Sequence, residues 1–253
     1  MPELSVSLWV AVIAITLIAG FVKGTVGFAM PMIMISGLGS ILAPELALAA
    51  LIIPTLATNA AQALRGGMSA AVASAKTHRR YIVIVMVMIA ASAQLVAILP
   101  SWALFLIIGV PVVVFALIQL AGVRFSIMPH QRVYAEFGLG GFSGFVGGMS
   151  GVWGPPTVLY LTALDTPKAE QMRVQGIIYG LAAVVLAVAH INSGVFTMAT
   201  APFSALLLVP ALLGMAVGFR MSDALDQVKF RKATLVVLVV AGLNLVRRGL
   251  AGL

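Results

Sequence analysis

Charged residues are scarce in this chain of 253 residues, of which only 9% are Asp, Glu, Lys or Arg. A soluble domain carries about a quarter charged residues. So few charges cannot solvate a globule of this size, which excludes a water-soluble enzyme. Apolar residues make up 62% of the chain, and the mean hydropathy is +1.14. We therefore expect an all-α membrane protein that crosses the bilayer several times.

Cysteine is absent altogether, which excludes thiolate metal sites, iron–sulfur clusters, disulfides and thiol catalysis. The apolar runs also contain no HExxH motif, no clustered histidines and no paired carboxylates. We therefore expect neither an enzyme nor a bound cofactor or metal. The first apolar stretch follows no basic segment and has no Ala-x-Ala-type cleavage site, so we expect a retained span rather than a removed signal peptide.

Ten apolar segments divide the chain, and each is predicted to be a helix within the membrane. The segments are 6–22, 25–40, 44–64, 80–99, 101–121, 133–147, 151–165, 168–190, 201–219 and 231–248. The first, second, sixth and seventh are short for a full crossing and meet in pairs at glycine-rich joints. Whether these four cross fully or re-enter the same face stays open at this point.

The two glycine-rich joints are copies of each other. Six residues of the first joint match six residues of the second at an offset of 124 positions: Gly20, Phe21, Val22, Gly24, Gly27 and Pro31 match Gly144, Phe145, Val146, Gly148, Gly151 and Pro155. A match at a half-chain offset predicts a duplicated unit. We expect a first repeat at residues 1–124 and a second at 125–253, which together form one transmembrane domain.

Basic residues cluster in alternate loops, after the third, fifth, seventh and ninth segments. They are Arg65, Lys76, Arg79, Arg80, Arg124, Arg132, Lys168, Arg173, Arg220, Lys229, Arg231 and Lys232. The positive-inside rule places these loops in the cytoplasm and both termini outside, and it explains the net charge of +8 without a nucleic-acid partner. Five segments per half is an odd number, so the repeats face opposite ways. Inverted repeats with broken helices are typical of secondary transporters.

We expect the two joints to form the binding site. A helix that begins inside the membrane presents unpaired N–H groups and about half a positive charge. Two such ends, at Gly24–Phe28 and Gly148–Val152, would make a cradle for an anion near the midplane. The predicted site residues are Lys23, Gly24, Thr25, Gly27, Phe28, Asn59 and Gln62 from the first half, and Gly148, Met149, Ser150, Gly151, Trp153, Arg173 and Gln175 from the second.

Several of these residues have a second interpretation. The glycines could serve close helix packing instead of ligand binding. Asn59 and Gln62 share one helix face, as do Gln175 and Tyr179, and each pair could join helices to each other. Arg173 could anchor its helix at the membrane interface. For a matched pair of joints in inverted halves, we favour a binding site.

The repeated Gly-x-x-x-Gly-x-x-Gly motifs, each followed by Phe or Val and then Pro, resemble the TauE/SafE sulfite exporter family of bacterial anion transporters. The resemblance covers the whole chain in length, two-half organisation and the positions of both motifs. It implies a multi-pass protein of the bacterial inner membrane that transports sulfite, sulfoacetate or a related sulfonate, often as an exporter. The chain departs from the pattern at Ala29 and Met30, where many relatives carry another glycine or small residue.

The residues and the resemblance agree on a small anion that is carried by alternating access. A cation transporter would hold Asp or Glu at depth, whereas the deep charge here is Lys23. The expected partners are the anion, the lipid bilayer and protons as the coupling ion. An anion channel and a transporter of carboxylates without sulfur are the alternatives, and the sequence does not determine the oligomeric state.

Overall fold

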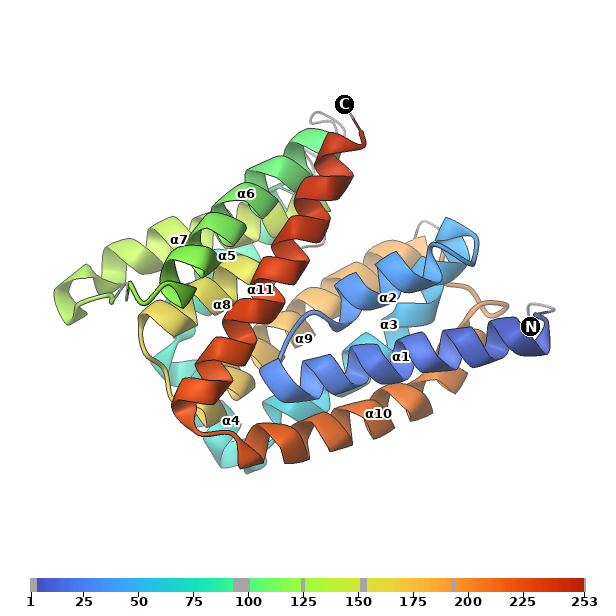
Figure 1. Cartoon of the computed structure of the whole chain (residues 1–253), viewed down its shortest axis with the longest axis horizontal. Helices are drawn as coiled ribbons and strands as arrows, with labels where there is room; N and C mark the ends of the chain where they lie inside the picture. The colour runs from blue at the N-terminus through green and yellow to red at the C-terminus, as the bar shows by residue number, and fades with distance from the viewer. Residues whose placement is uncertain (1–3, 93–100, 124–125, 151–153, 193, 253) are drawn as a thin grey trace.

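A computed structural model describes residues 4–92, 101–123, 126–150, 154–192 and 194–252, and the regular structure in those ranges is helical (Figure 1). The helices are α1 (Val6–Val26), α2 (Met30–Leu38), α3 (Pro44–Ala63), α4 (Gly67–Thr77), α5 (Arg79–Ser92), α6 (Ser101–Leu120), α7 (Arg132–Ser150), α8 (Gly154–Ala163), α9 (Lys168–Asn192), α10 (Ala201–Ala224) and α11 (Gln227–Leu250). In this part of the chain, five helices are long and apolar enough to cross a membrane: α1, α3, α9, α10 and α11. The predicted all-α, multi-pass class is confirmed.

Each side of the molecule contains a pair of parallel helices that contact each other through small residues. On one side, Gly20 of α1 faces the backbone of Ala211 on α10, and Gly24 faces Met215. On the other side, Gly144 of α7 faces the backbone of Val85 on α5. Because glycine has no side chain, the two helix backbones can approach closely at these contacts. Figure 1 shows α1 and α10 side by side, with α11 crossing toward α6.

Several helix contacts correspond to one another under the pairing of helices that the predicted repeats imply. The contact of α1 with α10 corresponds to that of α7 with α5, and the contact of α1 with α2 corresponds to that of α7 with α8. Two further pairs, α3 with α9 and α6 with α11, join helices that the predicted repeats make equivalent. Both of these pairs run antiparallel, since Gly176 lies on Ala63 while Gly180 lies near Asn59, and Gly109 lies on Gly242.

A proline inside α3 shows how one helix completes the hydrogen bonds of another. Pro54 has no N–H, so the Ala50 carbonyl one turn earlier loses its usual donor. Ser204, buried on α10, donates to that carbonyl at 3.2 Å and accepts from the Ile53 N–H at 3.1 Å. A freed carbonyl inside a membrane costs several kcal/mol unless it finds a donor. This serine therefore fastens α10 to α3.

The four basic loops lie at one end of the bundle, which we call the basic end. Four interactions connect them: Arg65 with Asp223 at 2.5 Å, Lys168 with the Ser222 carbonyl at 2.7 Å, Arg231 with Asp165 at 3.3 Å, and Arg132 with the Thr77 carbonyl at 2.8 Å. Their common location agrees with the charge pattern along the chain. Which side of the membrane this end faces stays a prediction.

The structure differs from the predicted segments in the first basic loop and at both joints. The first basic loop contains a helix, α4, because its alanine-rich sequence has a high helix propensity. Both joints also lie later than predicted. At the first, α1 continues to Val26 and α2 begins at Met30; at the second, α7 continues to Ser150 and α8 begins at Gly154. Gly20 and Gly24 keep a helical backbone, whereas Gly27 adopts the left-handed conformation that ends many helices.

The predicted orientation can be tested by cysteine labelling, because the natural chain has no cysteine. Ser69→Cys lies on the exposed surface of α4 at the basic end, and Met198→Cys replaces a side chain that is 91% exposed between α9 and α10. We expect a membrane-impermeant maleimide to label Met198→Cys in intact cells and Ser69→Cys only after permeabilisation. Labelling of both from the same side would contradict the orientation.

The packing of α1 on α10 predicts that Gly24→Leu is strongly destabilising. A Cβ at Gly24 would lie 2.3 Å from the Met215 carbonyl oxygen, and backbone cannot move aside as a flexible side chain can. We expect a loss of about 1–3 kcal/mol or more, measured by thermal unfolding of purified protein. The matched control is Gly138→Leu on α7, where a Cβ meets nothing within 4 Å. Equal unfolding temperatures for the two variants would contradict the close contact.

Candidate functional site

The chain between α1 and α2 has an unusual backbone conformation. Gly27 has a φ of +89° and donates its N–H to the Lys23 carbonyl at 2.7 Å, and Ala29 has a φ of +74°. A residue with a Cβ at such a φ costs about 1–2 kcal/mol. Strain of this kind concentrates at functional sites, where the surrounding structure maintains it. A Cβ at Gly27 would lie 1.9 Å from the Gln175 amide, so only glycine fits there.

The prediction that a helix begins at Gly24–Phe28 is wrong, because that stretch includes the last turn of α1. The matching prediction for Gly148–Val152 is wrong in the same way, because α7 continues to Ser150 and α8 begins at Gly154. Lys23 therefore lies near a helix C-terminus, whose partial negative charge favours a cation. The helix that begins at this break is α2, with Ala29 before its first residue. The N-terminal end that could face an anion is therefore at Ala29 and Met30.

Lys23 is the central charge of this region. Its side chain is 2% exposed, and its ammonium group donates to Oδ1 of Asn59 on α3 at 2.5 Å. The same ammonium lies 5.9 Å from the ring centre of Tyr179 on α9. Both neighbours are neutral, and no carboxylate of the described residues forms an ion pair with Lys23. A buried cation with neutral partners is costly inside a membrane.

Two glutamines satisfy the carbonyl groups that the helix break leaves free. Gln62 of α3 donates to the Gly27 carbonyl at 3.0 Å and to the Met172 carbonyl on α9 at 2.8 Å. Gln175 of α9, with its amide oriented to satisfy its neighbours, donates to the same Gly27 carbonyl at 2.9 Å and to that of Val26 at 3.3 Å. The break is therefore fastened to both α3 and α9.

The start of α8 lies next to this break. Tyr179 donates its hydroxyl to the carbonyl of Gly154, the first residue of α8, at 3.0 Å. A Cβ at Gly154 would be 3.8 Å from the Phe28 ring, just before α2. The beginnings of α2 and α8 therefore lie close together, beside Lys23 and Tyr179. Of the predicted residues in the second joint, Gly151 and Trp153 lie outside the described residues. For Gly148, Met149 and Ser150 the structure describes only the backbone.

The structure brings six predicted site residues to this break: Lys23, Gly27, Phe28, Asn59, Gln62 and Gln175. Three others have contacts elsewhere. Gly24 packs on α10, and Thr25 donates its hydroxyl to the Phe21 carbonyl at 2.9 Å. Arg173 donates to the Ser74 hydroxyl at 3.1 Å and lines a cavity of about 300 Å³ at the basic end.

Sequence reasoning missed a buried polar network at the basic end. Glu136 on α7 is 3% exposed, forms ion pairs with Arg80 and Arg132 at 3.2 and 3.0 Å, and accepts from the Tyr160 hydroxyl at 3.1 Å. Nearby, burial lowers the pKa of His78, and Glu170, 3.2 Å away, acts in the opposite direction. Glu136 lies only one turn into an apolar segment, so nothing in the local sequence indicated that it is buried.

Gln171 and Tyr179 also belong to the break but were not predicted as site residues. Gln171 donates to the Gln175 amide oxygen at 3.3 Å, in the orientation given above. The signal that could have found them is their spacing, because Gln171, Gln175 and Tyr179 follow one another at four-residue intervals on α9. Such spacing places all three on one helix face.

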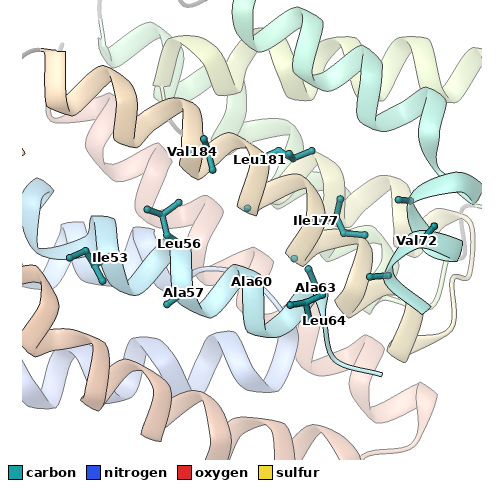
Figure 2. Close-up of a pocket in the computed structure, with 14 residues that line it drawn as sticks. Ile53, Leu56, Ala57, Ala60, Ala63, Leu64, Val72, Ile177, Leu181 and Val184 are labelled. Atoms are coloured by element: carbon teal, nitrogen blue, oxygen red, sulfur yellow. The ribbon is translucent and has the colours of Figure 1, made fainter. Parts of the chain in front are cut away.

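A larger groove lies on the outer surface of α3, α4 and α9, away from these polar groups. Figure 2 shows Leu56, Ile177 and Leu181 among the side chains that line it. Its volume is about 710 Å³, and its lining consists of apolar residues and glycine: Ile53, Leu56, Ala57, Ala60, Ala63, Leu64, Ala71, Val72, Ala75, Gly176, Ile177, Gly180, Leu181 and Val184. Such a surface suits lipid chains and offers nothing to hold an anion.

The contact between Lys23 and Asn59 predicts a specific pattern of stabilities. Asn59→Leu leaves the ammonium without its acceptor and should lower the free energy of unfolding by about 1.5–3 kcal/mol. Adding Lys23→Met removes the stranded charge, so the double variant should regain most of that loss. Thermal unfolding of the four proteins measures this coupling. If the losses in free energy of unfolding of the two single variants simply added up in the double variant, the contact would be contradicted.

Comparison with known proteins identifies the family of the chain. The family described as Sulfite exporter TauE/SafE matches residues 12–245, which include every predicted site residue. Searches of curated proteins and of solved structures found no match. The match covers nearly the whole chain, including both glycine-rich joints and all the helices that surround Lys23. The chain therefore belongs to the TauE/SafE family of membrane transporters.

Proposed function

We propose that the protein is a secondary transporter of a small sulfur-containing anion, either sulfite or a sulfonate such as sulfoacetate. We further propose that it exports this anion across the bacterial inner membrane, in keeping with the family description of a sulfite exporter. The proposed site is the break between α1 and α2, with Lys23 as the charge that the anion meets. We propose no catalytic activity and no bound cofactor.

The observation that carries this proposal is that Lys23 is buried without a carboxylate. Five of the seven Asp and Glu residues have basic partners elsewhere: Glu136, Asp165, Glu170, Asp223 and Asp226. Glu45 begins α3, fourteen residues before Asn59, which is about 21 Å along a helix. Glu3 precedes α1, whereas Lys23 lies on the last turn of that helix. Among the described residues no carboxylate therefore pairs with Lys23, and a substrate anion would supply the missing charge.

The surrounding helix ends support an anion rather than any other ligand. The N-terminus of α2, at Met30, and that of α8, at Gly154, both lie close to Phe28. Helix N-termini carry a partial positive charge. Met30 and Gly154 can offer N–H groups here, whereas Pro31, Pro155 and Pro156 have none. We propose that these two ends and the Lys23 ammonium hold the anion together. This retains the paired helix N-termini expected from the sequence, with α2 and α8 as the helices that provide them.

We propose that the anion reaches this site by alternating access of two inverted repeats. Antiparallel pairing of α3 with α9 and of α6 with α11 supports this, because an axis in the membrane plane relates equivalent helices in that way. Lys23, Asn59, Gln62 and Gln175 are all buried, so helices must separate before an anion can enter. A channel would instead need a continuous path.

Binding measurements on purified protein test the site. Lys23→Met should weaken binding of sulfite or sulfoacetate by about tenfold to a hundredfold, as expected for one lost charge-assisted hydrogen bond. Lys23→Arg should change the preference between the two anions, because a longer planar donor fits them differently. The matched control is Lys232→Met, which removes the same charge from an exposed position at the basic end. Unchanged affinity in Lys23→Met would overturn the proposed role of Lys23.

Transport into proteoliposomes distinguishes the alternatives. A carrier should show saturable flux of sulfite or sulfoacetate, and we propose the proton as the coupling ion, so a pH gradient should drive accumulation. Flux that does not saturate and ignores the pH gradient would indicate a channel. Saturable flux of acetate with none of the sulfur anions would instead indicate a carboxylate transporter.

A further inference from the structure

A second polar cavity lies at the basic end, about 380 Å³ in volume, where α4, α5 and α7 meet. Its lining consists of Lys76, Thr77, Arg79, Arg80, Pro129, Arg132, Val133 and Glu136. Four cations therefore surround a single carboxylate. A concave surface with this excess of positive charge attracts anions more strongly than scattered surface charges do.

The contacts inside this cavity leave two of its cations unpaired. Glu136 forms its ion pairs with Arg80 and Arg132, so those three charges largely satisfy one another. The side chains of Lys76 and Arg79 are exposed and form no hydrogen bond or ion pair with any described residue. These two side chains are therefore available to an anion from outside the protein.

The rim of the cavity is apolar on the side of α7. Val133 lines the cavity, and Phe137, 60% exposed, follows one turn later on the same helix face. Tyr134, 80% exposed, lies beside them. Exposed aromatic residues at the end of a membrane helix mark the depth of the lipid headgroups. The cations and the aromatic rim therefore lie where a phospholipid places its phosphate and the start of its acyl chains.

We propose that this cavity binds an anionic phospholipid, with its phosphate held by Lys76 and Arg79 and its acyl chains lying along Val133 and Phe137 of α7. Basic pockets between membrane helices suit such headgroups. A free phosphate ion would use the same cations but would gain nothing from the apolar rim. The proposal is independent of the anion site at Lys23.

The test is lipid binding to the purified full chain after delipidation, with phosphatidylglycerol and phosphatidylcholine as probes in native mass spectrometry. We expect phosphatidylglycerol to bind more tightly than phosphatidylcholine. In the double variant Lys76→Gln/Arg79→Gln, the affinity for phosphatidylglycerol should fall about tenfold or more. The matched control is Arg220→Gln/Lys232→Gln. It removes one arginine and one lysine that are also exposed at the basic end, but not from this cavity.

Each result decides the proposal. A loss confined to Lys76→Gln/Arg79→Gln supports a specific lipid site. Equal losses in both double variants would show only a general attraction of the basic end for anionic lipid, and equal binding of the two lipids would show no selectivity; either result overturns the proposal. Inorganic phosphate is the further probe. If it binds the wild type but not the variant while phosphatidylglycerol does not bind, the cavity is a free-anion site, and the lipid assignment fails.

Discussion

Breaking a helix inside a membrane leaves carbonyl groups that water cannot reach, and the centre of this protein is organised around that constraint. The last turn of α1 ends in the carbonyls of Val26 and Gly27, and amides from two other helices donate to them. The Gln62 side chain connects α3 to the break, and the Gln175 side chain connects α9 to it. Because each amide also contacts another part of α9, satisfying the backbone simultaneously assembles the bundle around Lys23.

Ion pairing is separated in space from the proposed site. The carboxylates of the basic end each meet a basic residue there, as Glu136 meets Arg80 and Asp223 meets Arg65. Lys23 has only the oxygen of Asn59 as a hydrogen-bond acceptor among the described residues. A neutral amide compensates a buried ammonium less well than a carboxylate does. The protein therefore keeps positive charge at its centre while balancing much of it at one end.

Much of the fold could be predicted from the sequence because bilayer thickness and charge distribution are simple constraints. Apolar length indicated ten segments, five of which are helices long and apolar enough to cross a membrane in the described part of the chain. The clusters around Arg65, Arg132, Lys168 and Arg231 indicated which loops lie at the same end. The helix α4 could not be predicted in this way, because a short helix at the membrane surface leaves no long apolar run. Its alanine content was the only local signal.

The candidate site could be predicted only in part, for physical reasons. Lys23 stood out because an isolated charge in an apolar run is rare, and the face shared by Asn59 and Gln62 is a matter of helix periodicity. The roles of Gly24 and Gly27 could not be separated by sequence, since glycine serves both close packing and left-handed turns. One packs on α10 and the other ends α1, and only the three-dimensional neighbours distinguish them.

The two bonds of Gln62 also bear on how long the site stays shut. They join the break before α2 to α9, so a motion that separates these parts must break one of them together with the Gln175 bond to the Gly27 carbonyl. Two hydrogen bonds at about 1 kcal/mol each, taken alone, would leave a few per cent of molecules open at any moment. Motions of whole helices on this scale take microseconds to milliseconds. By these bonds alone, the closed arrangement would be a frequently interrupted majority state, held by amide side chains that carry no charge.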